Sequence, residues 1–304
     1  LFVVSYSKVE IIKHELTGKT FHSNVERSES IKNIIDDSGD QTLILPLQGF
    51  IFFGSANRLL ERIKLHLQSQ NEKNLKYLVF DFKQVTGVDS STINSFNKLR
   101  ILAELDNFQV LFCNLTPKII SQFEAEGLFA DSMDLFLKFD DLDHGMEWCE
   151  EQIISKTTKG SNKLKEEIDE IKLFEEKFAD LLIYFESKDI SQNTTIIEQG
   201  SDPDGLYFIK SGRVTVELRS SNNKIRLKSM STGTVVGEVS LYLKTQATAS
   251  VISNTACKTY FLSHENFEKL NKETPERAAE LHTYIVKLLS DRLAKSNATI
   301  QALM

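Results

Sequence analysis

A run of short apolar stretches separated by turn residues occupies residues 190–263 and restricts the fold more than any other feature of the chain. Within this run apolar and polar residues alternate, and the breaks fall at Gly200, Asp204-Gly205, Ser211-Gly212, Asn222-Asn223 and Gly233. Many short strands at this spacing are typical of a β-roll or jelly-roll barrel. Apolar residues at helical spacing precede the run from Lys163 and follow it from Pro275. The second half of the chain therefore predicts an α+β fold, a β-roll with flanking helices.

The first half has a different pattern, in which expected strands and helices alternate. Near-continuous apolar stretches at 42–53, 76–82 and 109–113 predict buried strands, and residues 136–139 predict a short one. Helical patterns follow these stretches and are expected to begin near Ser55 (as an N-cap), Thr92, Pro117 and Asp141. This alternation predicts an α/β fold, a mostly parallel or mixed sheet covered by helices. Residues 1–20 are expected to form one or two strands, and the polar residues 24–41 a mobile loop.

These patterns predict two domains joined by a connecting segment. The first domain is expected over residues 1–155 and the second over residues 186–304. The connecting segment, 156–185, begins in a polar hinge at 155–162 and continues as a helix that we expect to pack on the second domain. A chain of 304 residues is long enough to give each domain its own core.

Composition excludes several classes of function. The net charge of −7 arises entirely in residues 1–158, with 16 Lys and Arg against 23 Asp and Glu, which argues against nucleic acid as a partner. The three cysteines are far apart and the six histidines fit no nucleophile, base or metal pattern. No P-loop and no dinucleotide fingerprint occurs. We therefore expect no catalysis, no metal site and no cofactor. The longest uncharged run, 41–57, is too short and too polar to span a bilayer.

Several residues of the first half resemble a STAS domain, the fold of bacterial anti-sigma-factor antagonists and of the cytosolic tail of SulP-type anion transporters. The resemblance is carried by Asp81-Phe82, Val85, Val88-Asp89-Ser90-Ser91 and Leu111 to Leu128. The runs at 3–10 and 48–57 are most similar to fungal SulP-like proteins. The resemblance implies that residues 1–20 lie next to a membrane. It also implies a cytosolic position at a vacuolar or other internal membrane. Because the chain begins with Leu1 rather than Met, we interpret it as part of a longer protein.

The Asp89-Ser90-Ser91-Thr92 turn has two interpretations. Asp89 or Ser90 can simply cap the following helix. In antagonist members of the STAS family a serine of this turn is phosphorylated, which the resemblance extends to Ser90 or Ser91. A phosphate at a helix N-terminus is favoured by free N–H groups. Here Thr92 stands where that family has glycine, which leaves less room for a kinase.

The second half resembles a cyclic nucleotide-binding domain. The resemblance is carried by the run Gly200 to Ile209, by Ser211-Gly-Arg-Val, and by residues 233–250, which match the family's phosphate-binding cassette. It implies that Gly237 and Glu238 contact the ribose and the phosphate, and that Ala249 and Ser250 line the phosphate. The last helix stands where the family folds a lid over the nucleotide.

The cassette lacks the arginine that neutralises the cyclic phosphate, because Ala247 stands at that position and Gln246 replaces the usual proline. Losing a charge-assisted phosphate contact costs on the order of 2–4 kcal/mol. Lys244 could compensate only if the cassette bends toward the pocket. We therefore predict a degenerate pocket that does not respond to cyclic nucleotide, in a domain that serves as a structural or protein-docking module.

The leading hypothesis is a non-catalytic cytosolic regulatory region of a SulP-type transporter, whose solute is an anion such as sulfate or another small molecule. Its own transmembrane domain is the expected partner, together with regulatory proteins and a second copy of the chain. One alternative is a soluble signalling protein switched by cyclic nucleotide or by phosphorylation. A third is a scaffold that dimerises through its long last helix.

Overall fold

A computed structural model describes residues 10–27, 29–69, 75–129, 135–158, 164–202, 204–220 and 223–303. The chain forms two compact units, each with its own core. The first unit comprises the residues up to Ser23 together with Asn33–Thr157. The second comprises Asn24–Lys32 and the residues from Thr158 onward. A short segment near the N-terminus therefore belongs to the second unit, although the sequence patterns place it in the first domain.

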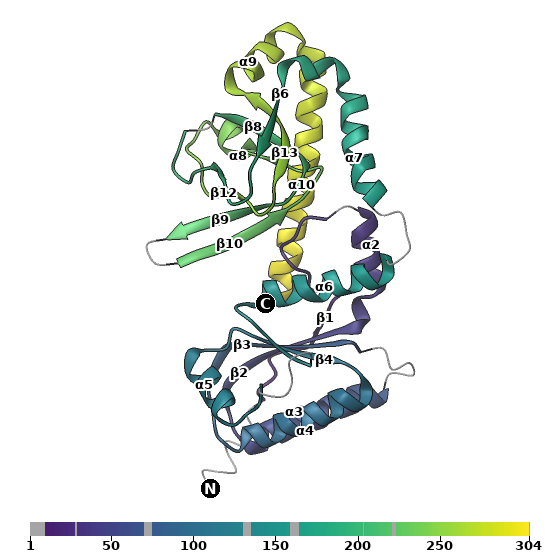
Figure 1. Cartoon of the computed structure of the whole chain (residues 1–304), viewed down its shortest axis with the longest axis vertical. Coiled ribbons are helices and arrows are strands. Elements are labelled where there is room, and N and C mark those ends of the chain that lie inside the picture. The colour runs from purple at the N-terminus through teal and green to yellow at the C-terminus, as the bar shows by residue number, and fades with distance from the viewer. Residues whose placement is uncertain are drawn as a thin grey trace. The chain divides into compact units, whose positions relative to one another are not determined.

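The first unit is a five-stranded sheet with helices on both faces (Figure 1). Its strands lie in the order β1-β2-β3-β4-β5, with β1 antiparallel to β2 and the other neighbours parallel. The strands are β1 (Leu16–Thr17), β2 (Thr42–Ile51), β3 (Tyr77–Val88), β4 (Gln109–Cys113) and β5 (Phe136–Phe139). The helices are α2 (Glu29–Asp37), which the first unit includes from Asn33 onward, the 3-10 turn η1 (Gly39–Gln41), α3 (Phe53–Ser69), α4 (Thr92–Asp106), α5 (Pro117–Ala125) and α6 (Leu142–Thr158). This confirms the predicted α/β fold.

Alternation along the buried strands sends side chains to both faces of this sheet. Phe80 and Phe112 face α3 and α4, where Phe96 lies 5.6 Å from Phe112 between ring centres. On the opposite face Tyr77 meets Trp148 of α6 edge to face at 5.7 Å. Both faces are therefore packed, which accounts for the near-continuous apolar character of β3.

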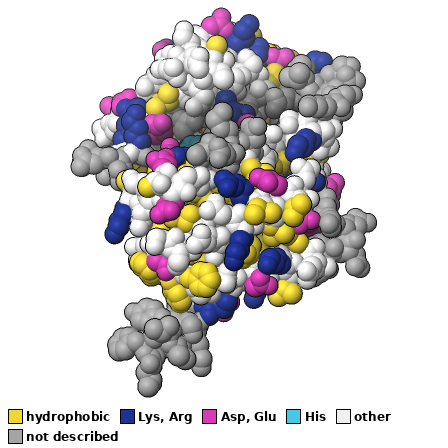
Figure 2. Space-filling model, turned by 60° about the horizontal axis from the view of Figure 1, so that its bottom comes forward, with side chains coloured by type: hydrophobic (Ala, Val, Ile, Leu, Met, Phe, Trp, Pro, Cys, Tyr) yellow, Lys and Arg dark blue, Asp and Glu magenta, His cyan; other side chains and the backbone are white. Residues whose placement is uncertain are grey.

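Apolar side chains also remain exposed on α3 and α4, namely Leu65, Ile101 and Leu105. Figure 2 shows apolar side chains on the lower part of the molecule lying among Lys, Arg, Asp and Glu. Scattered apolar residues of this kind are ordinary on a protein surface. Among the described residues, none of the helices is long and apolar enough to cross a membrane.

Three local predictions for the first half were wrong. Residues 24–41 are not a loop, because α2 and η1 occupy most of them and Ile35 is buried. The signal was the spacing of Ile31, Ile34 and Ile35, which is that of one helix face. Ser55 is not an N-cap, because α3 begins at Phe53 and the Ser55 hydroxyl bonds back to Phe52.

The third wrong prediction concerns the hinge expected at residues 155–162. Helix α6 continues to Thr158, so the first four residues of that segment are helical. Residues 159–163 lie outside the described residues, as do residues 1–9 of the predicted N-terminal strands. The described part of that N-terminal stretch contains β1 and a bridge between Ile12 and Leu47.

The second unit is a β-roll of two four-stranded antiparallel sheets, which confirms the fold predicted for this half (Figure 1). The strand orders are β10-β9-β12-β7 and β11-β8-β13-β6. The strands are β6 (Glu186–Ile190), β7 (Thr195–Ile197), β8 (Gly205–Ser211), β9 (Val214–Ser220), β10 (Asn223–Met230), β11 (Val235–Val236), β12 (Ser250–Ser253) and β13 (Cys257–Ser263). The helices are α7 (Leu164–Lys177), the 3-10 segment η2 (Ala179–Tyr184), α8 (Glu238–Leu243), α9 (His264–Glu273) and α10 (Pro275–Leu303).

Helices α7 and α10 complete the core of this unit. Phe174 of α7 stacks on Phe208 of β8 at 4.8 Å between ring centres. Leu281 and Ile285 of α10 are fully buried in the same apolar cluster. The helix before the roll therefore packs on the second domain, as predicted, and the first half of α10 is fixed against the roll.

The segment that begins at Asn24 extends the roll at the edge strand β10. Val25 forms a parallel bridge with Ser229. The Glu26 N–H donates to the Ser229 carbonyl at 2.8 Å, and the Ser229 N–H donates to the Asn24 carbonyl at 2.9 Å. These backbone bonds fix where the Glu26 side chain can reach.

Replacing Phe112 by Ala should destabilise the first unit by about 3–5 kcal/mol, because the ring is fully buried among other aromatic rings and its loss leaves a cavity. Trp148 is the single tryptophan of the chain and lies in this unit, so its fluorescence during urea unfolding reports on this unit alone. The matched control is Ile101→Ala, whose side chain is 56% exposed and should cost less than about 0.5 kcal/mol. Equal shifts in the two variants would contradict the assigned core.

Candidate ligand-binding site

A cavity of about 320 Å³ lies in the second unit beside α10. Most of its wall is apolar, with Val216, Met230, Val236, Val251 and Leu289 among the lining residues. Three charged residues, Lys228, Glu238 and Arg292, also line it. An apolar hollow with a few converging polar groups is the usual form of a small-molecule site.

Gly237 directs the chain into this cavity. It links β11 to α8 with a φ of +89°, a backbone conformation that favours glycine. A Cβ atom there would lie 2.5 Å from the carbonyl oxygen of Gly205. Glycine is therefore required by the backbone itself, and it places Glu238 at the start of α8 with its side chain in the cavity wall.

Glu238 is bound by an arginine from the last helix. The residue is only 5% exposed, and its Oε1 accepts a hydrogen bond from Nη1 of Arg292 at 2.7 Å. Burial raises the pKa of Glu238, and the charge of Arg292 opposes that rise. The carboxylate in the position expected to meet a ribose therefore already has a partner within the domain.

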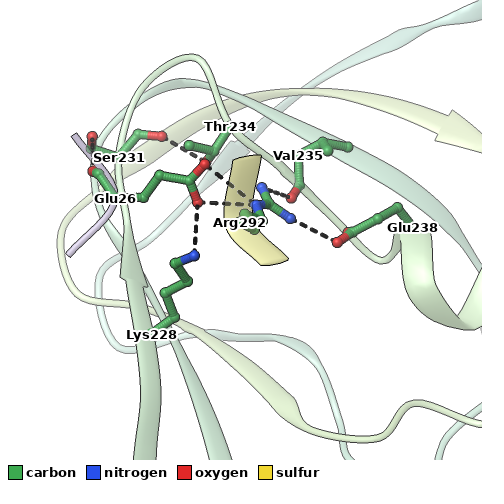
Figure 3. Close-up of polar contacts among 7 residues, drawn as sticks. All are labelled: Glu26, Lys228, Ser231, Thr234, Val235, Glu238 and Arg292. Atoms are coloured by element: carbon green, nitrogen blue, oxygen red, sulfur yellow. Dashed lines mark hydrogen bonds and ion pairs between the residues drawn. The ribbon is translucent and has the colours of Figure 1, made fainter. Parts of the chain in front are cut away.

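Arg292 makes two further contacts, so that each of its three guanidinium nitrogens is engaged (Figure 3). Nη2 donates to the Val235 carbonyl at 2.8 Å, and Nε donates to Oε2 of Glu26 at 3.0 Å. Arg292 is 8% exposed. Lys228 Nζ lies 3.9 Å from the same Glu26 oxygen, and burial lowers the pKa of this lysine against the attraction of Glu26. Two carboxylates thus face two cations in a site of low solvent exposure.

The predicted cassette residues are only partly brought together. Gly237, Glu238, Ala249 and Ala247 all line the cavity. Ser250 is fully buried, and its hydroxyl accepts a hydrogen bond from the Gln199 N–H at 3.0 Å, which makes it part of the strand packing.

Nothing at the arginine position of the cassette supplies a positive charge. Ala247 is 4% exposed, and its backbone pairs with Ser201 and Gly200. Lys244 is exposed, and it is not among the residues that line the cavity.

Sequence reasoning missed the residues that dominate the site: Glu26, Lys228 and Arg292. For Arg292 a signal existed, because it follows Leu281, Ile285 and Leu288 on the apolar face of α10 at helical spacing. A lone basic residue on an apolar face needs a buried acceptor. Glu26 carried no such signal.

Comparison with known families now identifies both units. Residues 32–142 match the STAS domain family, and residues 187–274 match the cyclic nucleotide-binding domain family. The chain carries a STAS domain and a cyclic nucleotide-binding domain. Within the described residues no group of His, Cys, Asp and Glu is arranged to hold a metal ion. Both families are regulatory rather than catalytic.

Individual proteins are similar to this chain only at low sequence identity. The vacuolar basic amino acid transporter VSB1 of Saccharomyces cerevisiae is 29% identical over 177 residues, which are 56% of this chain and 17% of that protein. Glutaminase 2 of Bradyrhizobium diazoefficiens is 24% identical over 293 residues, 92% of this chain and 44% of that protein. The chain thus spans less than half the length of either relative. A cyclic nucleotide-binding domain of Methylobacillus flagellatus aligns with 19% identity and a TM-score of 0.40 over 42% of this chain and 73% of that one.

In the STAS domain the turn before α4 is organised by Asp89. Its Oδ1 accepts hydrogen bonds from the Ser91 hydroxyl at 2.8 Å and from the Thr92 N–H at 2.8 Å. Burial alone would raise the pKa of Asp89, but these hydrogen bonds together lower it. Asp89 therefore caps α4, while Ser90 is exposed beside it.

A histidine holds α10 to the cassette helix of the nucleotide-binding domain. His282 Nδ1 lies 2.6 Å from the Tyr242 hydroxyl, and its Nε2 lies 2.8 Å from Asn271 Oδ1. Burial raises the pKa of Tyr242 to about 12, so the hydroxyl stays protonated and donates. Burial also lowers the pKa of His282. The neutral ring, accepting at Nδ1 and donating from Nε2, satisfies both partners.

This lowered pKa makes the stability of the nucleotide-binding domain depend on pH. The unfolded state takes up a proton at the ordinary histidine pKa of 6.5, whereas the folded state resists it. The contribution of His282 is therefore fully present above pH 6.5 and is lost as the pH falls toward the lower folded value. His282→Gln should reduce the pH dependence of the melting temperature of this domain between about pH 5 and pH 8, the range in which histidine titrates. Calorimetric unfolding at a series of pH values measures this dependence. His264→Gln, at an exposed position, is the control and should leave the curve unchanged.

Proposed function

We propose that this chain is the non-catalytic regulatory region of a SulP-type transmembrane transporter, facing the cytosol at the vacuolar or another internal membrane of a fungus. The observation that carries the proposal is the similarity to the yeast vacuolar transporter, combined with the presence of both regulatory domains in one chain. The matched part is 17% of that transporter, which leaves most of that protein for its membrane-spanning part. The first partner of this region is then its own transmembrane domain.

The solute follows from the relatives rather than from the two domains. The SulP resemblance alone favours an inorganic anion such as sulfate. The yeast relative is a transporter of basic amino acids, and this relative favours the same solute class for the present protein.

We also propose that the nucleotide-binding domain does not respond to cyclic nucleotide. Ala247 offers the cyclic phosphate no counter-charge, and Arg292 engages the carboxylate that would bind the ribose. Bringing an anionic phosphate into a site whose charges already balance leaves that anion unpaired, which is costly at low solvent exposure. The pocket serves the domain as an internal contact between the roll and α10.

Exposed residues favour two further partners. Val286, Leu293 and Ile300 of α10 are exposed apolar residues spaced by seven, which is the repeat of a helix-pairing seam. This spacing favours a second copy of the chain as a partner through α10. Exposed Ser90 at the start of α4 is open to a regulatory kinase.

Calorimetric titration of the chain with cAMP or cGMP should give no binding heat at high micromolar protein concentration, because the phosphate has no cation to pair with. The double variant Ala247→Arg, Arg292→Ala should gain affinity by roughly 30- to 1000-fold, the equivalent of one charge-assisted contact. Arg292→Ala alone is the control and should gain much less. Micromolar binding by the unmodified chain that Glu238→Ala abolishes would contradict the proposal.

A second candidate is favoured by one observation, namely that the similarity to the glutaminase extends over both domains and 92% of this chain. In that case the same regulatory region would be joined to a catalytic domain instead of a transporter, in a soluble signalling protein.

Fractionation of the source cells with an antibody against residues 164–303 separates the two candidates. The transporter proposal predicts that the native protein sediments with internal membranes and resists carbonate extraction. An antibody signal in the soluble fraction that co-purifies with glutaminase activity would contradict it and support the second candidate. Cells lacking the gene should also show reduced uptake of a basic amino acid into vacuoles.

A further inference from the structure

The cluster around Arg292 has the form of a receptor for a guanidinium group (Figure 3). Glu238, Glu26 and the Val235 carbonyl each accept from a different nitrogen of the same guanidinium. All three acceptors belong to the second unit. A planar guanidinium presents its donors in a fixed fork, and an ammonium group cannot reproduce these directions. The acceptors therefore favour a guanidinium over an ammonium group, whether the guanidinium belongs to α10 or to another molecule.

The charges of the cluster set the charge of any replacement ligand. In the ion pairs that join them, two carboxylates, Glu26 and Glu238, match two cations, Lys228 and Arg292, and Lys32 acts on Lys228 from outside these pairs. If Arg292 leaves, the buried carboxylate of Glu238 loses its partner, which is unfavourable because a buried charge without a partner is costly. A ligand of net charge +1 restores the balance, whereas an anion such as a cyclic phosphate makes it worse.

Space for such a ligand adjoins the acceptors. The cavity of about 320 Å³ continues from Arg292 along the apolar side chains of Met230, Val236 and Leu289. Lys228 lines the same cavity and lies beside Glu26. A small molecule with a guanidinium group and a short aliphatic chain therefore finds acceptors for its charged end and an apolar wall for its chain.

The helix that carries Arg292 is held mainly upstream of it. Leu281 and Ile285 are fully buried in the core, and His282 is bound to Tyr242 and Asn271. Around Arg292 itself, Asp291, Leu293 and Ala294 are exposed. The end of α10 can therefore leave the roll without disturbing the core, and among the contacts of the described residues after Leu289 those of the Arg292 guanidinium break.

We propose that the cradle formed by Glu26, Glu238 and the Val235 carbonyl is a binding site for a small guanidinium compound of net charge +1, which displaces Arg292 and releases the end of α10. Arg292 is then a tethered competitor that keeps the site closed until the free ligand accumulates. A tethered group competes at an effective concentration on the order of millimolar, so the exchange responds to ligand in that range. The proposal does not depend on what the regulatory region is joined to.

The test uses L-arginine, of net charge +1, as the probe, and L-citrulline, an isostere whose side chain is uncharged, as the comparison, on the whole chain. Arg292→Ala leaves the cradle vacant and should bind L-arginine at least about tenfold more tightly than the unmodified chain, because the tethered competitor is gone. Its melting temperature should rise with L-arginine and not with L-citrulline. Lys287→Ala, which removes an exposed cation from the same helix, is the matched control and should behave as the unmodified chain.

Two further variants examine the acceptors. Adding Glu238→Gln or Glu26→Gln to Arg292→Ala should abolish the preference for L-arginine over L-citrulline, because each removes one of the two carboxylates. An equal response of Arg292→Ala to the two compounds, or a response to neither, would overturn the proposal.

If Arg292→Ala does not fold, hydrogen exchange on the unmodified chain decides the question. Millimolar L-arginine, the order of the tethered group's effective concentration, should lower the protection of backbone amides after Leu289 while leaving those around Leu281 unchanged. L-Citrulline should leave the protection of both groups of amides unchanged. Protection after Leu289 that L-arginine leaves unchanged would refute the exchange.

Discussion

The second domain depends on one buried interaction, the guanidinium of Arg292 held by Glu238, Glu26 and the Val235 carbonyl. Each carboxylate would be costly to bury alone, and removing one partner of such a group commonly costs about 3–5 kcal/mol. The arginine therefore joins three parts of the domain that are far apart in the sequence: the cassette, the last helix and the segment beside β10. Arg292 also lines the apolar cavity, so this contact holds the end of α10 beside it.

The same contact explains how a cyclic nucleotide-binding fold can persist without a charge for the cyclic phosphate. Gly237 is required by its close approach to the Gly205 carbonyl, whether or not a ligand binds. Glu238 has an internal partner, so its carboxylate is satisfied without a ribose. Ala247 then fits an apolar wall in which an arginine would have no anion to meet. In this domain the cassette backbone is set by Gly237, and the charge of Glu238 is met from within the chain by Arg292.

The architecture could be predicted from the sequence because local patterns determine it. Turn residues such as Gly233 and the alternation between them specify the roll, and the apolar run that includes Phe80 and Phe82 specifies a strand covered on both faces. The loop prediction for residues 24–41 was wrong because the polar residues around Ile31, Ile34 and Ile35 concealed a helix face.

The site was predictable only where its residues share a local motif. Gly237 and Glu238 lie in the cassette and were identified, whereas Arg292 lies 54 positions from Glu238 and 266 positions from Glu26. No periodicity or motif relates positions at such separations, since only the folded chain brings them together. A buried arginine on an apolar helix face indicates that an acceptor exists, but it does not say which one.

The most direct test of the account is the side-chain signal of Arg292 in a proton–nitrogen NMR spectrum of the chain. An Nε–H engaged by a buried carboxylate exchanges slowly with water, so we predict a protected resonance at neutral pH, assigned by its absence in Arg292→Lys. Glu26→Gln, which alters the acceptor of this Nε–H, should weaken that protection, while addition of cAMP should leave it unchanged. An Arg292 resonance that exchanges as fast as that of a solvent-exposed arginine would contradict the account, because the guanidinium would then not join α10 to the segment that carries Glu26.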